Sequence, residues 1–361
     1  MLNEIREHLK NGIIPFWEGL KDEEFGGYYG YMDYDLKLDK KFEKGCILNS
    51  RILWFFSSVS RIEGFEKERE YADHAYQFLK EKCLDQECGG VFWSVTYDGK
   101  PLDTTKHTYN QAFAIYALSS YYDTTGNEEA LEIAKGLQKI IEEKCTAEKT
   151  MNTLLHVFEA YTEFYRVTKD KFTGDRLRFM LDIFADKVYN PAQKRQEVFF
   201  DREWNTLIDL YSYGHDIETS WLIDRGLEVL DDPAYTAKVA PITKEILANV
   251  YKTAYRDHSL MNECENGVND TTRVWWVQAE SVVGFLNGYQ KDPAEKKYLQ
   301  AAEDVWDYIK NYMIDKRNDS EWYWCIHEDH TPVEKPIVEP WKCPYHNGRM
   351  CIEVIRRMKD I

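Results

Sequence analysis

Three histidines lie in segments whose residue pattern predicts buried helices, and imidazole is the side chain best suited to proton transfer near neutral pH. They are His156, His215 and His346. His156 has Asn152 one helical turn before it and His215 has Glu218 three residues after it, so each pair shares one face of its helix. One buried histidine is usually structural, but three that converge on one cavity are hard to explain by packing. The set therefore predicts general acid/base chemistry.

Three charged residues fall on the same kind of segment: Arg51, Glu159 and Glu280. Burying such a charge costs on the order of several kcal/mol unless it is paired or faces a polar cavity. Either an internal Arg51–Glu280 pair or a wet central cleft would satisfy this requirement. A cleft with histidines and carboxylates suits two kinds of sugar chemistry, namely glycoside hydrolysis by a carboxylate pair and proton transfer at the carbon next to a carbonyl.

The composition agrees with a small polar ligand such as a sugar. The 361 residues include 11 Trp, 25 Tyr and 17 Phe, and many lie beside charged residues, an arrangement that suits the apolar faces and hydroxyl edges of sugar rings. The net charge of -17 argues against a nucleic-acid partner, because an acidic surface repels phosphates. The sequence also lacks a convincing glycine-rich phosphate loop or His-Glu-x-x-His motif, which excludes nucleotide and zinc-protease readings.

Several features predict a cytoplasmic protein. The eight cysteines are scattered, and the closest pair, Cys83 and Cys88, has no second pair of similar spacing, so neither a zinc site nor a disulfide framework is expected. The first residues, Met1–Glu7, alternate charged and apolar side chains and do not resemble a signal peptide. The most apolar stretch, Ile47–Val59, is too short to cross a bilayer, so no membrane partner is expected.

The elements that must position these side chains are helices of two kinds. One kind is amphipathic and charged on one side, as expected of outer helices, over residues 2–17, 66–83, 127–145, 170–188, 233–254 and 293–313. The other kind is denser in aromatic and small residues, as expected of inner helices, over residues 46–62, 108–122, 150–167, 215–230, 273–289 and 343–358. Because the two kinds alternate without a Pro-, Gly- or Ser-rich linker, they predict an all-α (α/α)6 barrel, a single catalytic domain over 1–361.

Short motifs between the helices predict β-hairpins at one rim of this barrel. Gly26–Tyr31 and Gly89–Trp93 each place a glycine pair, which allows a tight turn, before alternating aromatic residues. The starts of the inner segments are 62, 42, 65, 58 and 70 residues apart, and the spacing of 42 belongs to the third repeat. Only about Cys145–Lys149 separates the helices there, so the third hairpin is missing.

The ordered set of motifs resembles the cellobiose 2-epimerases, within the N-acylglucosamine 2-epimerase superfamily. The motifs extend over nearly the whole chain and are Ser50–Trp54, Lys106–Asn110, Met151–His156, Ser212–Glu218, Arg273–Glu280 and Trp341–Arg349. The resemblance implies an (α/α)6 barrel that opens the reducing-end sugar of a β-1,4-linked disaccharide, removes its C2 proton and returns a proton from the other face. Cellobiose would thereby become 4-O-β-glucosyl-mannose, and lactose is an expected second substrate.

The resemblance also implies roles for individual residues. His215 and His346 would be the acid/base pair, with His156 near the ring oxygen and Arg51 beside the oxyanion that grows on O1 or O2. Glu218 and Glu280 would orient the histidines. The residues expected to line the sugar cleft are Tyr109, Asn152, Trp276 and Trp341, the last as a stacking platform. The chemistry implies no metal or other cofactor, and we expect a monomer.

This sequence departs from the family at two places. Asn49 stands where close relatives often have histidine, and the third repeat lacks roughly thirty residues near 143–149 that help to wall the cleft. The alternatives are therefore an N-acylglucosamine 2-epimerase or aldose–ketose isomerase on the same fold, or a catalytically impaired sugar-binding barrel. Glycoside hydrolysis is disfavoured because no separate acid and nucleophile stand out.

Overall fold

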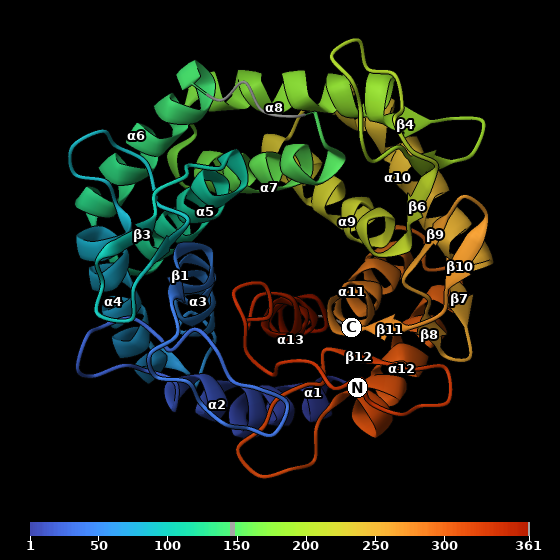
Figure 1. Cartoon of the computed structure of the whole chain (residues 1–361). Helices are drawn as coiled ribbons and strands as arrows, with labels where there is room; N and C mark the ends of the chain where they lie inside the picture. Colours follow the sequence, from blue (N-terminus) through green and yellow to red (C-terminus); the bar gives the residue numbers. More distant parts are fainter. Residues whose placement is uncertain (145–148, 360–361) are drawn as a thin grey trace. The chain divides into compact units, whose positions relative to one another are not determined.

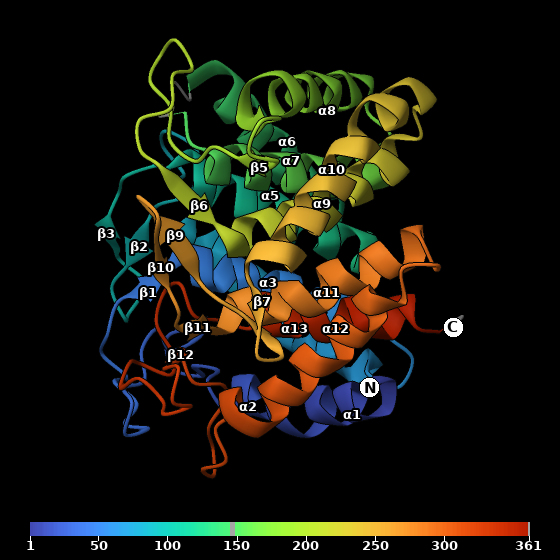
Figure 2. The same ribbon diagram turned by 90° about the vertical axis from the view of Figure 1, so that its right-hand side faces the viewer.

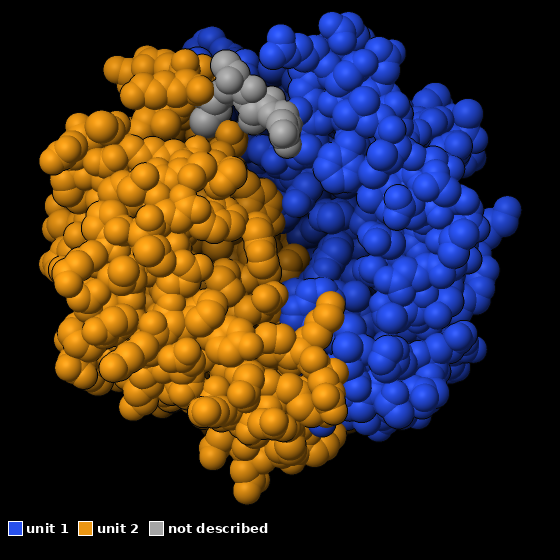
Figure 3. Space-filling model, viewed as in Figure 1, with its two compact units in different colours: residues 1, 147–314, 323–333 blue, residues 2–146, 315–322, 334–361 orange. Residues whose placement is uncertain are grey.

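The computed structural model describes residues 1–144 and 149–359. They form two compact units, coloured separately in Figure 3. Unit 1 comprises residues 1, 147–314 and 323–333, and unit 2 comprises residues 2–146, 315–322 and 334–361, as far as they are described. The single domain over 1–361 stays a prediction.

The inner helices of unit 2 are α3 (Cys46–Val59), α5 (Thr108–Thr125) and α13 (His346–Arg357) (Figure 1). Every residue of α3 is buried, which explains its run of apolar and small side chains around the single charge of Arg51. The outer segments are amphipathic, and several continue into short π- or 3₁₀-helical turns: α1 (Leu2–His8), η1 (Leu9–Ile13), α2 (Ile14–Glu18), η2 (Glu66–Glu68), α4 (Arg69–Phe78), η3 (Leu79–Cys83) and α6 (Glu128–Lys144).

The inner helices of unit 1 are α7 (Met151–Thr168), α9 (Tyr213–Leu230) and α11 (Trp275–Lys291). Its outer segments are α8 (Lys171–Ile183), η4 (Phe184–Val188), α10 (Pro233–Thr253), α12 (Lys296–Tyr308) and η5 (Ile309–Met313). The bounds of the predicted helical segments in both units agree with the structure to within three residues, so the predicted alternation is confirmed within each unit. Across the described residues, none of the helices is both long and apolar enough to cross a membrane.

Two glycines allow α9 and α11 to run side by side, as both views show (Figure 1, Figure 2). A Cβ on Gly214 would lie 2.4 Å from Cη2 of Trp276, and one on Gly284 would lie 2.6 Å from Cγ1 of Ile217. Such distances are far below van der Waals contact, so only glycine fits at these points. The close approach brings the first turns of the two helices together.

Short strands form the connections before the inner helices. One three-stranded antiparallel sheet has the order β1 (Lys44–Gly45), β2 (Ser94–Val95), β3 (Pro101–Asp103), and the other has the order β10 (Val268–Asp270), β9 (Glu263–Glu265), β6 (Leu210–Ser212). Two-stranded sheets pair β4 (Tyr189–Asn190) with β5 (Arg195–Gln196), β7 (Tyr255–Arg256) with β8 (Ser259–Leu260), and β11 (Arg273–Val274) with β12 (Cys325–Ile326).

The predicted rim hairpins are confirmed as turns, but the strand after each glycine pair is reduced to one bridge. Gly26, Gly27, Gly89 and Gly90 all have positive φ, as the tight turns require. The bridges join Lys21 to Tyr28 and Leu84 to Val91, and continuous strands form only further along the chain. The predicted gap at the third repeat falls largely on residues 145–148, which lie outside the described residues.

Candidate active site

The second turn of α7 and the first turn of α9 carry two of the histidines in unit 1. His156 Nδ1 lies 2.9 Å from Oε2 of Glu159, and both side chains are buried, so the carboxylate fixes the orientation of this ring. His215 lies at the third position of α9, directly after β6, and its Nδ1 is 2.7 Å from Oγ of Ser212. The sequence showed the carboxylate near His156, but Ser212 was missed as a partner of His215.

His215 is a neutral base at physiological pH. Its ring keeps some exposed surface, yet the surrounding protein lowers its pKa to about 3 by desolvation, and a charge on His156 lowers it further. When Nδ1 donates its hydrogen to Ser212, Nε2 carries the lone pair that can accept a proton. The indole of Trp276 lies against the imidazole, with ring centres 4.8 Å apart.

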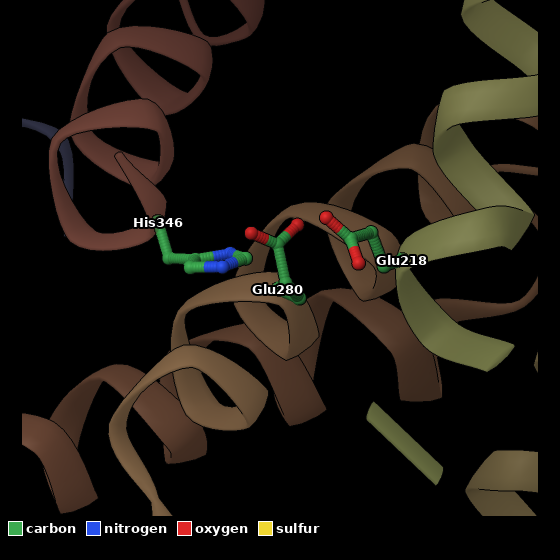
Figure 4. A group of neighbouring side chains, drawn as sticks. All are labelled: Glu218, Glu280 and His346. Atoms are coloured by element: carbon green, nitrogen blue, oxygen red, sulfur yellow. The ribbon is translucent and has the colours of Figure 1, made fainter. Parts of the chain in front are cut away.

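Two buried carboxylates face each other beside this histidine. Glu218 from α9 and Glu280 from α11 point their carboxylates together in Figure 4, and oxygens of the two lie within 4.8 Å of each other. Glu280 also accepts a hydrogen bond of 3.0 Å from Nε1 of Trp221. These two carboxylates are the groups of unit 1 that could share a cation or a hydrogen-bond donor of a ligand. The predicted independence from metal ions stays a prediction.

Asn152 supplies an acceptor on the first turn of α7. Its Oδ1 is buried and has no hydrogen-bond partner among the described residues. A buried polar atom without a partner is unfavourable, so a ligand hydroxyl at this point would be stabilising. The structure therefore brings together Asn152 and His156 on α7, and His215, Glu218, Trp276 and Glu280 at the junction of α9 and α11.

Unit 2 holds Arg51 inside a ring of aromatic side chains. The guanidinium carbon lies 4.1 Å from the ring centre of Phe113, 4.7 Å from that of Tyr345 and 5.8 Å from that of Tyr109. Its Nη2 donates to the Tyr109 hydroxyl at 2.9 Å, and its Nη1 donates to the Trp341 carbonyl at 3.3 Å. The predicted neighbours Tyr109 and Trp341 are thus placed with Arg51.

Within residues 1–144 and 149–359, the charge of Arg51 is not balanced by a carboxylate. Among the described residues, the ion pairs include none to Arg51, and its Nε has no hydrogen-bond partner. Desolvation would lower the pKa of this side chain, but Tyr109, Cys343 and Tyr345 raise it above the usual value. The predicted internal pair with Glu280 stays a prediction. A buried cation of this kind is suited to stabilising negative charge that develops on a ligand.

The last motif of the sequence contributes Trp341 and His346 to unit 2, and Trp341 contacts Arg51. Trp341 is 42% exposed, and its ring centre lies 5.4 Å from that of Trp93 and 5.8 Å from that of Tyr109. His346 is the first residue of α13 (Figure 4), and its ring centre lies 4.6 Å from that of Tyr345. An exposed indole beside other aromatic rings is typical of a sugar-stacking surface.

Three aromatic residues of this region were missed in the sequence. Phe113 lies one turn after Tyr109 and therefore on the same face of α5, which was a usable signal. Tyr345 adjoins His346, but its contact with Arg51 joins residues far apart in the chain. Trp93 belongs to a predicted hairpin motif, and its tilted contact with Trp341 likewise joins residues far apart in the chain.

Comparison with known proteins gives a consistent result. Residues 26–348 match the family model described as N-acylglucosamine 2-epimerase (GlcNAc 2-epimerase). A cellobiose 2-epimerase of Ruminococcus albus is 47% identical over an alignment of 389 residues that covers 100% of both chains. Because this chain has 361 residues, about 28 aligned positions of that relative have no counterpart here.

Solved structures agree over the same length. A sugar epimerase from a ruminal bacterium superposes with a TM-score of 0.97 at 47% identity, and the match covers 100% of both chains. The cellobiose 2-epimerase of Bacillus thermoamylovorans B4167 superposes with a TM-score of 0.95 at 44% identity, covering 99% of both chains. These matches confirm the predicted fold class, an all-α (α/α)6 barrel.

Proposed function

The chain belongs to the N-acylglucosamine 2-epimerase family, and from this membership we propose that it is a cellobiose 2-epimerase. The reaction is the reversible inversion of C2 in the reducing-end glucose of β-1,4-linked disaccharides. Cellobiose gives 4-O-β-glucosyl-mannose, and lactose reacts in the same way. The proposal is supported by full-length relatives that carry this name at 43–47% identity.

The observation that carries the chemistry is the buried guanidinium of Arg51, which donates to the Trp341 carbonyl and the Tyr109 hydroxyl and has no ion pair among the described residues. Removal of the C2 proton from the open-chain sugar places negative charge on the oxygens at C1 and C2 as a cis-enediolate forms. A fixed, desolvated cation stabilises this charge more than it stabilises the neutral substrate. Preorganised electrostatics of this kind distinguish a catalytic site from a merely binding one.

We assign the proton transfers to His215 and His346. One imidazole accepts the C2 proton as the enediolate forms, and the other donates a proton to C2 from the opposite face, so the configuration inverts without a net change in atoms. The lowered pKa of His215, about 3, supports its entry into the cycle as a neutral base. Which histidine acts first depends on whether the glucose or the mannose form is bound.

The remaining residues bind and orient the substrate. His156, held by Glu159, assists ring opening at the ring oxygen. Glu218 and Glu280 orient the acid/base histidines. Tyr109, Asn152, Trp276 and Trp341 bind the sugar rings, with Trp341 as the stacking surface. We further propose that the enzyme is a cytoplasmic monomer that needs no metal ion or cofactor, so dialysis against EDTA should leave its activity unchanged.

Two related activities remain as alternatives on this fold. An N-acylglucosamine 2-epimerase would turn over N-acetylglucosamine, and an aldose–ketose isomerase would form a ketose. A third alternative is a catalytically impaired sugar-binding barrel, because the third rim hairpin is missing.

Product analysis separates these possibilities. The purified enzyme is incubated with cellobiose, N-acetylglucosamine and mannose in turn, and the products are resolved by anion-exchange chromatography. The proposal expects 4-O-β-glucosyl-mannose from cellobiose at a rate well above that of any product from the two monosaccharides. Cellobiose that binds but stays unchanged would support the impaired barrel and contradict the proposal.

A further inference from the structure

Pairs of an acidic residue and a lysine recur before the inner helices of unit 2. The distances from Nζ to the carboxylate are 2.5 Å for Asp22–Lys44, 2.5 Å for Asp85–Lys106 and 2.7 Å for Glu321–Lys342. The partners are separated by 22, 21 and 21 residues, respectively. Each lysine lies shortly before an inner helix, and each acid lies shortly after the preceding outer helix. The pairs therefore hold equivalent connections in three repeats.

An amide side chain in the first turn of each of these inner helices also contacts the connection, but in two different ways. Asn49 accepts from the backbone N of Tyr28 at 3.0 Å, and Gln111 accepts from the backbone N of Val91 at 2.7 Å. In these two repeats the amide thus bonds to backbone. Asn347 of α13 instead donates to Oε1 of Glu321 at 2.5 Å. In the Glu321–Lys342 pair, the acid is therefore bonded directly to the inner helix.

Glu321 collects donors on both of its oxygens. Oε1 also accepts from Nε1 of Trp17 at 3.1 Å, and Oε2 accepts from the backbone N of Trp322 at 3.0 Å and from Nζ of Lys342 at 2.7 Å. The side chain is buried, which alone would raise its pKa, but Lys342 and these donors hold the pKa below its usual value. The carboxylate is therefore charged and fixed at neutral pH.

The two partners of Glu321 flank the last part of the candidate site. Lys342 directly follows Trp341, whose carbonyl accepts a hydrogen bond from Arg51, and Asn347 directly follows His346. The segment from Trp341 to His346 is thus anchored at both ends by one buried carboxylate. A displacement of about 1 Å at a reacting group can lower a rate about 100-fold, so this anchor bears on the chemistry.

We propose that Glu321 is a positioning residue that holds His346 in place through Asn347. The proposal rests on the proposed function in taking His346 as an acid/base group. Glu321 contacts no substrate in this scheme and acts only through α13. Its role differs from that of Asp22 and Asp85, whose bonds among the described residues go to backbone N–H groups of their own turns and to a lysine before the inner helix.

Replacing Glu321 alone would leave the buried charge of Lys342 without a partner, so paired variants give the sharper test. The E321M/K342M variant removes both charges and the acceptor for Asn347. The matched E321Q/K342M variant also removes both charges, but its amide oxygen still accepts from Asn347 and Trp17. We expect kcat for cellobiose to fall at least about tenfold in the first variant, with a smaller change in KM, and to stay within about threefold of wild type in the second.

Two further variants control for folding. N347L leaves the Glu321–Lys342 pair in place and removes its bond to α13, together with the hydrogen bond from the backbone N of Gly348 to the Asn347 amide oxygen. We expect the same loss of kcat in this variant, which tests the proposal even if E321M/K342M does not fold. D85N weakens the partly exposed pair with Lys106 and is expected to keep kcat within about twofold of wild type. Circular dichroism establishes that each variant is folded. Equal kcat values in folded E321M/K342M and E321Q/K342M, or an unchanged kcat in N347L, would overturn the proposal.

A second readout separates this proposal from the proposed function. Histidine is labelled with ¹⁵N, and the ring signals of His346 are assigned by their absence in H346N. Their shifts and titration midpoint should change in E321M/K342M and N347L but not in E321Q/K342M. If the wild-type enzyme does not epimerise cellobiose, the proposed function fails, and this ring readout still decides whether Glu321 positions His346. Unchanged ring signals in all three variants would overturn the positioning role.

Discussion

The connection from η3 to α5 and the connection from α6 to α7 stand at equivalent points of neighbouring repeats, yet they differ in length. The first runs over residues 84–107 and contains β2 and β3, whereas the second has only residues 145–150. Lys106 and Lys149 each lie two residues before their inner helix. Lys106 pairs with Asp85, while Lys149 donates to the carbonyl of Arg202 and lies 4.6 Å from the ring centre of Trp204.

The difference shows that the next connection in the chain, which includes Val198 and Phe200, holds the start of α7. The backbone N of Met151 donates to the carbonyl of Val198 at 2.9 Å, and the backbone N of Phe200 donates to the carbonyl of Lys149 at 3.1 Å. Thr150 caps the helix by accepting from the backbone N of Thr153 at 3.2 Å. The start of α7 is therefore fixed, and we expect the short connection to be compatible with activity.

The largest expected effect is a loss of stability when the Asp22–Lys44 pair, in the connection before α3, is broken. Both partners of Asp22–Lys44 are buried, so Lys44→Met leaves an uncompensated carboxylate in the protein. We expect the free energy of unfolding to fall by about 3–5 kcal/mol, measured by urea denaturation. Lys106→Met, in the partly exposed pair with Asp85, serves as the control and should cost about 1 kcal/mol. Equal losses of unfolding free energy in the two variants would show that burial does not decide how much each pair contributes to stability.

The next largest effect is a pH-dependent loss of stability at His8, which lies in α1 of unit 2 and contacts Trp322. Burial lowers the pKa of His8 from 6.5 to about 4, and its Nε2 accepts from Nε1 of Trp322 at 2.8 Å. Because the unfolded chain binds this proton first, stability present above pH 6.5 is lost as the pH falls toward 4, by about 3 kcal/mol in total. His8→Gln keeps an acceptor for Trp322 and should flatten this part of the pH–stability curve. An unchanged slope between pH 6.5 and 4 in this variant would assign the acid sensitivity elsewhere.

A smaller effect is expected on catalysis in the repeat with the short connection. Glu159→Gln removes the charge that orients His156 while keeping the shape of the side chain. We expect kcat for cellobiose to fall about tenfold, because the ring loses its fixed tautomer and orientation. Steady-state kinetics measures this change, and circular dichroism controls for folding. An unchanged kcat would mean that His156 does not take part in the reaction. It would then contradict the conclusion that α7 is held in a catalytically competent position despite its short connection.

The smallest effect is expected at Lys149 itself. Its amine is partly exposed and, within the described part of the chain, contacts a carbonyl and an aromatic face, so Lys149→Met should change the free energy of unfolding by less than about 1 kcal/mol. Thermal or urea denaturation against the Lys106→Met control measures the difference. A loss of several kcal/mol would show that Lys149 is held by a strong interaction after all.

Much of the helical frame could be predicted from local patterns. The charged faces of residues 66–83 and 170–188 and the dense apolar run from Cys46 to Val59 report burial along single helices, and the structure agrees. The hairpin of β9 and β10 was missed although Asn266 and Gly267, both with positive φ, are a strong turn signal. This turn has a single glycine, whereas each of the predicted rim turns has a glycine pair.

The parts that could not be predicted depend on contacts between distant residues. The aromatic side chains that surround Arg51 of α3 come from α5 and from the segment before α13, and no local spacing reveals this arrangement. The bond of Glu321 to Asn347 likewise joins a connection to the first turn of α13 over 26 residues, and no local spacing reveals it. The roles given to His215 and His346 come from the resemblance and stay proposals.

The most direct test is proton NMR of cellobiose with the purified enzyme in D₂O, for the wild type, H215N and H346N. The wild type should remove the C2 proton of the reducing-end glucose, form a mannose-type reducing end and place deuterium at C2. Both variants should be folded and should lose C2 inversion. A mannose-type product without deuterium at C2, or near-normal turnover by H346N, would contradict epimerisation by two histidines through an enediolate.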